Sequence, residues 1–340
     1  MSKENNLVLY RKYRPQSFSD VVGQEQIVEL LTSSIKQKKI GHAYMFCGSR
    51  GTGKTTVARI FAHDIGCNPE DIIEIDAASN RGIDEIRELR EAVRTAPFSS
   101  PYKVYIVDEA HMLTKEAANA LLKTLEEPPS HVVFILATTD PNKLPQTIVS
   151  RCQKIIFKQP DNKTLADRLI YVAGEEGNSI TNESAELIAR HSMGSYRDAL
   201  GILEQILTTG GKKIKDEDVT LFLGIPDKEL LISLLESLCL KDGKQILEIT
   251  DKLNLNNSSA IKTYDEFIEL LRQGLIIRVG ENVLEEGELT RIATEYPHTI
   301  GSKTILELLE RRHLLKISDI HSWTAFRAIL LCLARSEVEK

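Results

Sequence analysis

Short apolar runs recur along the first half of the chain, separated by longer stretches of mixed polar and apolar residues. The runs lie at residues 43–47, 72–75, 104–107, 132–137 and 155–157. Short apolar runs are typical of buried strands, and the stretches between them are compatible with helices. The alternation predicts an α/β fold with a parallel sheet.

At Pro160 the pattern changes to that of a helical lid, which ends near residue 226. The remainder of the chain shows apolar residues at mixed spacings of three and four. Helices are expected at residues 230–238, 243–253, 264–279, 288–296, 303–315 and 322–336. We therefore expect an α/β domain over residues 1–160, a small helical lid over 161–224 and an all-helical domain over 225–340. Trp323 is expected in the core of the last domain.

A glycine-rich loop directly follows the first apolar run. Its residues are Gly48, Ser49, Arg50, Gly51, Thr52, Gly53, Lys54 and Thr55, and the residues after it, 55–62, are compatible with a helix. In such a loop backbone N–H groups cradle phosphates, the lysine reaches the β and γ phosphates, and the hydroxyl after it binds Mg²⁺. An ordinary glycine-rich turn is the alternative, and the strand and helix around the loop argue against it. The loop predicts binding of a nucleoside triphosphate.

Two carboxylates, Asp108 and Glu109, come just after the third apolar run. Ligands collect at the carboxyl ends of strands in open α/β sheets, so these side chains are expected beside the phosphates. Asp108 suits the Mg²⁺ shell and Glu109 suits activation of water, which favours hydrolysis over transfer to another acceptor. The alternative is a pair of solvated turn residues.

Three further polar features follow along the chain, and their order indicates an active site. Thr138-Thr139-Asp140 ends the fourth run, Ser150-Arg151-Cys152 follows, and Arg197 comes after a helical stretch. A polar side chain at a strand tip can hold water or sense the γ phosphate, and arginines can neutralise charge in the transition state, one from the same subunit and one from a neighbour. Taken alone, each arginine is more typical of a surface ion pair.

Composition narrows the setting. The chain has 340 residues, 42% of them hydrophobic, and a formal net charge of -6, which argues against a protein that coats nucleic acid everywhere. An apolar signal core is missing from the first residues, and no stretch approaches the roughly 20 apolar residues of a membrane span, so we expect a cytoplasmic protein. The five cysteines, Cys47, Cys67, Cys152, Cys239 and Cys332, are scattered and predict neither disulfides nor a zinc site.

These motifs together resemble the bacterial DNA polymerase III clamp-loader subunits gamma/tau, a family of AAA+ ATPases. The resemblance is dense through about the first 200 residues and rests on length and helical pattern beyond residue 225. It is carried by the phosphate loop and by residues 10–15, 22–24, 74–82, 108–113, 119–129, 137–139 and 150–152.

The resemblance implies roles for individual residues. Lys54 and Thr55 would bind phosphate and Mg²⁺, Asp108 and Glu109 would form the Walker B pair, and Thr139 would be the first sensor. Arg197 would be a second sensor acting in cis, and Arg151 an arginine finger reaching the ATP site of the adjacent subunit. The adenine would lie against Tyr10, Arg14, Pro15 and Val22, with Thr56 following the loop in the nucleotide site.

One departure from the family concerns zinc. Family members usually carry a zinc-binding insertion with four cysteines, whereas here residues 67–71 bridge that gap with Cys67 alone. A structural zinc normally needs four protein ligands, so we expect no bound zinc.

The resemblance implies an ATP- and Mg²⁺-dependent motor subunit that loads the sliding clamp onto primer-template DNA. Its partners would be the clamp, the delta and delta prime subunits and DNA, within a hetero- or homo-oligomeric ring whose collar would be the C-terminal domain. For that domain the helical pattern leaves a monomeric helical domain as the alternative. The chain is expected to resemble the gamma form or a shortened tau, without the long tau-like extension. Two alternatives remain: a stator-like subunit of the delta prime type that does not hydrolyse ATP, and an AAA+ branch-migration motor.

Candidate DNA contacts are Asn80, Arg81 and Lys115, which lie where helices are expected to begin. Arg87, Arg90 and Arg94 share a predicted helix with interleaved glutamates, so a solvated mixed-charge face is the better reading there.

Overall fold

A computed structural model describes residues 7–79, 89, 91–209, 214–256, 258–280, 287–316 and 321–335. The chain forms two compact units, Met1–Lys215 and Asp216–Lys340. The boundary expected near residue 160 falls inside the first unit, and the one expected near residue 224 lies a little beyond the division. The three-domain division stays a prediction.

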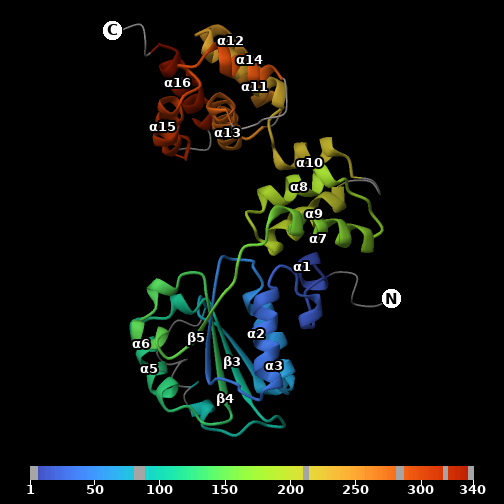
Figure 1. Cartoon of the computed structure of the whole chain (residues 1–340), viewed down its shortest axis with the longest axis vertical. Helices are drawn as coiled ribbons and strands as arrows, with labels where there is room; N and C mark the ends of the chain where they lie inside the picture. Colours follow the sequence, from blue (N-terminus) through green and yellow to red (C-terminus); the bar gives the residue numbers. More distant parts are fainter. Residues whose placement is uncertain are drawn as a thin grey trace. The chain divides into compact units, whose positions relative to one another are not determined.

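The first unit contains a five-stranded parallel sheet (Figure 1). Its strands appear in the order β2-β3-β4-β1-β5 and are β1 Ala43–Cys47, β2 Ile72–Asp76, β3 Lys103–Asp108, β4 Val132–Thr138 and β5 Gln153–Ile156. All five correspond to the apolar runs of the sequence, so the expected α/β fold is confirmed. Because the strands are parallel, the carboxyl ends of β1, β3 and β4 lie at one edge of the sheet.

Eight α-helices of the first unit lie within the described residues. They are α1 Leu9–Lys12, α2 Glu25–Lys36, α3 Lys54–Asp64, α5 Lys115–Glu126, α6 Gln146–Val149, α7 Asn162–Glu175, α8 Asn182–His191 and α9 Tyr196–Thr209, with short 3-10 turns at Phe18–Asp20, Pro69–Asp71, Ala110–Met112 and Pro141–Lys143. Side chains cap several of them. Thr114 accepts a hydrogen bond from the N–H of Ala117 at the start of α5, and Asp161 accepts one from Thr164 at the start of α7.

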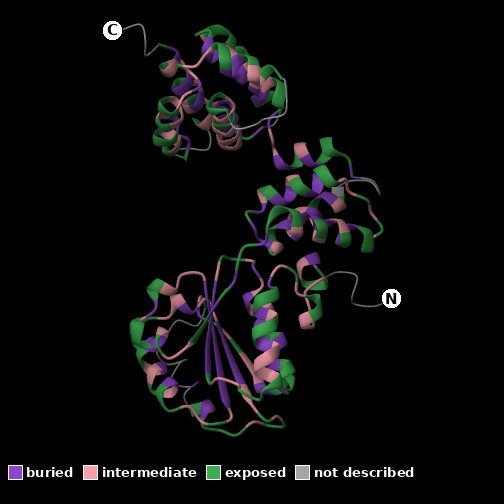
Figure 2. Ribbon diagram, viewed as in Figure 1, coloured by how far each residue is buried: buried purple, intermediate pink, exposed green. Residues whose placement is uncertain are grey.

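The sheet is covered on both faces (Figure 2). Successive strand residues point to opposite faces, so Phe46 of β1 packs with α2 and α3, while Met45 packs with α5 and α6. Burial on both sides explains why the inner strands β1, β3 and β4 read as apolar runs, whereas the edge strands β2 and β5 carry polar residues and are partly exposed.

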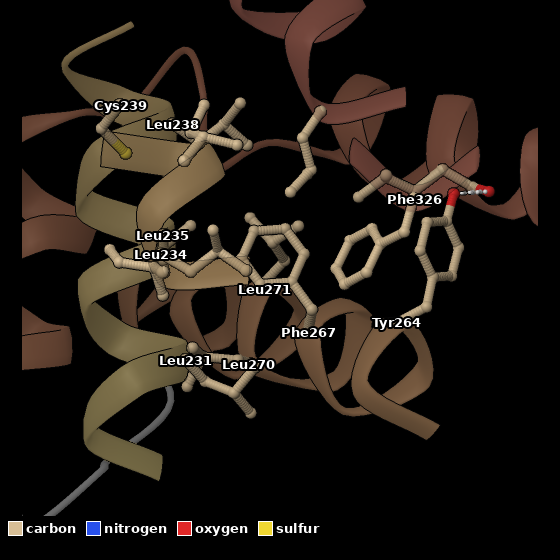
Figure 3. Packing of buried hydrophobic residues seen from close by; sticks show 14 of the residues in the cluster. Leu231, Leu234, Leu235, Leu238, Cys239, Tyr264, Phe267, Leu270, Leu271 and Phe326 are labelled. Atoms are coloured by element: carbon tan, nitrogen blue, oxygen red, sulfur yellow. Dashed lines mark hydrogen bonds between the residues drawn. The ribbon is translucent and has the colours of Figure 1, made fainter. Parts of the chain in front are cut away.

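The second unit is helical throughout its described residues. Its elements are α10 Asp216–Leu223, α11 Lys228–Cys239, α12 Gly243–Leu255, α13 Ala260–Val279, α14 Glu288–Glu295, α15 Ser302–Arg311, the 3-10 helix Arg312–Lys316 and α16 Ser322–Arg335. The helices from α11 onward share one apolar core, in which Tyr264 and Phe326 meet edge to face at 5.1 Å (Figure 3). The Tyr264 hydroxyl donates to the Leu308 carbonyl over 2.7 Å. Trp323 stacks on Phe326 at the margin of this core.

Among the described helices, none combines the length and the apolar composition that crossing a membrane requires.

Candidate nucleotide-binding site

One pocket of the first unit gathers most of the predicted site residues. Its wall comes from the loop after β1, the end of β3, the N-terminal segment and the start of α9. The predicted residues that line it are Tyr10, Arg14, Pro15, Val22, Arg50, Gly51, Thr52, Gly53, Lys54, Thr55, Thr56, Asp108, Glu109 and Arg197. Gly48, Ser49, Thr139 and Arg151 do not line it.

The loop between β1 and α3 is shaped by its glycines and by Lys54. Gly51 has a φ of +75°, and a Cβ there would overlap the Ser195 hydroxyl, so this position requires glycine. The Lys54 ammonium is buried and donates to the carbonyls of Gly48 and Ser49, each over 2.8 Å. Burial lowers the pKa of Lys54, and the nearby Glu109 and Asp108 carboxylates act against that shift. The lysine therefore lies inside the loop, where a polyphosphate could take over its hydrogen bonds.

The residues expected to hold Mg²⁺ touch each other. Thr55 Oγ1 donates to Asp108 Oδ2 over 2.7 Å, and Asp108 Oδ1 accepts the N–H of Glu109 at 2.9 Å. Mg²⁺ prefers oxygen ligands and takes few of them from the protein, with water and phosphate supplying the others. This hydroxyl and carboxylate fit that ion. No cluster of three or more histidine, cysteine, aspartate or glutamate side chains that could hold a metal occurs in the described part of the chain.

Glu109 is held in an unusual conformation beside the pocket. Its φ of 48° and ψ of 43° lie in the left-handed region, which is uncommon for residues other than glycine and concentrates at functional sites. Its carboxylate accepts a hydrogen bond from Thr139 Oγ1 at 3.4 Å and lies 3.5 Å from His111 Nδ1. Thr139 therefore reaches the site through Glu109 rather than by lining the pocket itself.

The buried Thr138 contacts His111, the residue that lies beside the Glu109 carboxylate. Its Oγ1 accepts the N–H of Asp140 and lies 3.1 Å from His111 Nδ1. The two threonines at the end of β4 thus have different surroundings, because Thr138 faces the interior and Thr139 faces Glu109.

The opposite wall of the pocket is aromatic and basic. The Arg197 guanidinium lies over the Tyr10 ring, 5.7 Å from its centroid. Arg14 Nε donates to Thr56 Oγ1 over 3.1 Å, and burial lowers the pKa of Arg14. Together with Lys54 and Arg50, these side chains place positive charge around a pocket that also has apolar wall at Val22, a combination that suits a base joined to several phosphates.

Arg151 lies away from the pocket of its own chain. Its Nη2 pairs with Glu126 Oε1 at 2.7 Å, and its Nη1 donates to the Thr147 carbonyl at 2.7 Å. Among the candidate DNA contacts, Lys115 begins α5, whereas Asn80 and Arg81 lie outside the described residues, as do Arg87 and Arg90.

Sequence reasoning missed seven residues of the pocket wall: Tyr13, Asp20, Val21, Val57, Arg168, Tyr196 and Leu200. Tyr13 and Tyr196 each stand beside a residue that was predicted, so their position along the chain was a usable signal. Arg168 had no such signal. It reaches the site because α7 brings its guanidinium to the Tyr13 carbonyl, 2.9 Å away.

Comparisons with known proteins find relatives of this chain among subunits of DNA polymerase III. A family model described as "DNA polymerase III, delta subunit" matches residues 23–79 and 68–161. DNA polymerase III subunit tau of Bacillus subtilis is 40% identical over 326 residues, which cover 89% of this chain and 58% of that subunit. DNA polymerase III subunit gamma of Buchnera aphidicola subsp. Acyrthosiphon pisum is 35% identical over 289 residues, which cover 79% of each chain.

The chain spans about half the length of the tau subunits that it matches, as the 58% for Bacillus subtilis and the 45% for Escherichia coli show. Among solved structures, the Thermotoga maritima RuvB Holliday junction branch migration motor is similar, with a TM-score of 0.53, 21% identity, and coverage of 66% of this chain and 79% of that one. At that identity the likeness concerns the fold alone.

Proposed function

Since the chain belongs to the DNA polymerase III gamma/tau family, we propose that it is an ATP-hydrolysing motor subunit of a clamp loader, which opens a sliding clamp and loads it onto primed DNA. The observation that carries the proposal is the meeting of Lys54, Thr55, Asp108, Glu109 and Arg197 around one pocket. These are the groups that phosphoryl transfer to water needs, since that chemistry depends on positioning and on neutralising charge.

In this mechanism the triphosphate lies along the loop of residues 48–55, with the Lys54 ammonium turning from the loop carbonyls to the β and γ phosphates. Thr55 and Asp108 would hold Mg²⁺, which supplies charge neutralisation between the phosphates when it is bound. Glu109 accepts the proton of the attacking water, and Thr139 keeps that carboxylate oriented through its hydrogen bond. Arg197 approaches the γ phosphate from α9.

We further propose that Arg151 acts in the pocket of a neighbouring subunit. Its guanidinium is directed to Glu126 and Thr147, and it does not line the pocket of its own chain. A finger supplied in trans would make hydrolysis depend on assembly. The helices from residue 225 onward would form the collar that holds the ring together, and the partners would be delta, delta prime, the clamp and primer-template DNA in the cytoplasm.

A stator-like subunit that does not hydrolyse ATP is the second candidate, because the matching family model is described as a delta subunit. The complete loop with Asp108 and Glu109 beside it favours hydrolysis. A branch-migration motor has only the fold likeness in its favour.

The proposal is tested by measuring ATP hydrolysis by the purified chain alone and after addition of the clamp, primed DNA and the two partner subunits. A motor subunit should be stimulated strongly, and only when all components are present. A stator would show no hydrolysis of its own, and a branch-migration motor would respond to branched DNA without the clamp. Either result would contradict the proposal.

A further inference from the structure

The Tyr196 hydroxyl joins two walls of the pocket that are far apart in sequence. It donates a hydrogen bond to the Val22 carbonyl over 2.9 Å. Val22 belongs to the apolar wall proposed for the base, and Tyr196 is the first residue of α9, directly before Arg197. Burial raises the pKa of Tyr196 to about 12, so the hydroxyl stays protonated and remains a donor at neutral pH.

The same residue is also attached to the phosphate loop. The Tyr196 N–H donates to the Gly51 carbonyl over 3.0 Å, and Ser195 packs so closely on Gly51 that no Cβ would fit there. The first residue of α9 is thus hydrogen-bonded to the phosphate loop through its backbone N–H and to the base wall through its side-chain hydroxyl.

Another part of the N-terminal segment, Tyr13, is hydrogen-bonded to α7 and to Glu176, the residue after it. The Tyr13 hydroxyl donates to Glu176 Oε1 at 2.5 Å, and Arg168 Nη2 donates to the Tyr13 carbonyl at 2.9 Å. The segment that lines the base side of the pocket is therefore hydrogen-bonded to α7 at Tyr13 and to α9 at Val22. A movement of α7 or α9 would be transmitted to the base wall through these two hydrogen bonds.

We propose that Tyr196 is a positioning residue for nucleotide binding. Its hydroxyl fixes the position of the base wall at Val22 relative to the phosphate loop. The inference rests on the proposed function, because it assigns a role within the same ATP site. Tyr196 does not need to touch the phosphates to act. Its contribution should therefore appear for ligands that carry a base and be absent for ligands that consist of phosphates only.

The test compares the wild-type chain with Tyr196→Phe, which removes the hydroxyl and keeps the ring. Tyr171→Phe is the matched control, since Tyr171 is an exposed tyrosine on α7 that does not line the pocket. Isothermal titration with ATP and with inorganic tripolyphosphate, both with Mg²⁺, gives the two dissociation constants. A single neutral hydrogen bond predicts a rise of roughly two- to tenfold for ATP with Tyr196→Phe. Tripolyphosphate binding should stay unchanged, and Tyr171→Phe should change neither constant.

Two results would overturn the inference. If Tyr196→Phe binds ATP as the wild type does, the hydroxyl does not position the base wall. If ATP and tripolyphosphate weaken equally, Tyr196 acts on the phosphate loop instead. Thermal unfolding of both variants shows whether the fold is kept. A wild-type chain that binds tripolyphosphate and ATP equally would also overturn the inference, whereas one that binds neither would contradict the proposed function itself and with it this role for Tyr196.

Discussion

Thr139 Oγ1 donates a hydrogen bond to Glu109 Oε2 over 3.4 Å, across the gap between the ends of β4 and β3. The hydroxyl of one strand tip thus orients the carboxylate of its neighbour. If Thr139 is a sensor, it would respond to the γ phosphate through the Glu109 carboxylate, which is also the group proposed to activate water. Recognition of the triphosphate would then be coupled to its hydrolysis.

Glu109→Gln should keep ATP binding and stop hydrolysis. The amide preserves the size of the side chain and leaves Thr55 and Asp108 free to hold Mg²⁺, but it cannot take the proton of water. We expect the rate of hydrolysis to fall by about 10² to 10⁴, with the dissociation constant for ATP within a few-fold of the wild type. Glu116→Gln, an exposed change at the start of α5, is the control. Hydrolysis at the wild-type rate by Glu109→Gln would remove the role assigned to this carboxylate.

Lys54→Ala should lose triphosphate binding while the chain stays folded. The ammonium is buried among loop carbonyls, and no other described cation lies inside the loop in this way. Equilibrium binding of ATP, measured beside the exposed variant Lys39→Ala, checks this. Retention of wild-type affinity in Lys54→Ala would place the triphosphate elsewhere.

Much of the fold could be predicted from the sequence because the signals were local. Each strand of the sheet overlaps one of the predicted apolar runs, and the loop of residues 48–55 follows β1 without a gap. The positions of Asp108 and Thr139 follow from parallel strands ending at one edge. The bond from Tyr196 to Val22 could not be predicted in this way, since it joins residues 174 positions apart and depends on how α9 packs. The same holds for Arg168 at Tyr13, and the pairing of Arg151 with Glu126 likewise depends on how α5 and α6 pack.

The pH dependence of stability should carry a signature of Glu176. Hydrogen bonds from Lys12 and then from Tyr13 lower the pKa of this carboxylate below its ordinary value of 4.5. A lowered folded-state pKa contributes stability above the unfolded-state value, and that stability is lost as the pH falls below about 4.5 through the folded-state pKa. Glu176→Gln should therefore lower the free energy of unfolding at pH 7 by about 0.5 to 1 kcal/mol.

Urea unfolding of the wild type, Glu176→Gln and the exposed control Glu175→Gln at pH 7 and below pH 4 checks this expectation. The difference between wild type and Glu176→Gln should shrink at the lower pH. A difference that is equal at both values would mean that the charge of Glu176 contributes nothing.

Metal analysis of the purified chain should find no stoichiometric zinc. Cys67 stands alone in its part of the sequence, its thiol donates to the Tyr102 carbonyl over 3.2 Å, and burial raises its pKa to about 11, so it stays protonated. Zinc binds the thiolate. About one zinc per chain that resists mild chelation would contradict this and point to ligands that were not recognised.

The proposed dependence of hydrolysis on assembly requires that Arg151 acts in the pocket of a neighbouring subunit. Mixing two inactive variants tests that claim most directly. Chains with Arg151→Ala keep an intact phosphate loop, and chains with Lys54→Ala keep an intact finger. Each variant alone, assembled with its partner subunits, should lose most hydrolysis, since a finger in trans contributes about 10³ to 10⁵ in rate in well-studied systems. In mixed assemblies, verified by mass, the account predicts partial recovery where a Lys54→Ala chain presents its finger to an Arg151→Ala chain. Absence of recovery in verified mixed assemblies would contradict the account and leave Arg151 as the structural partner of Glu126.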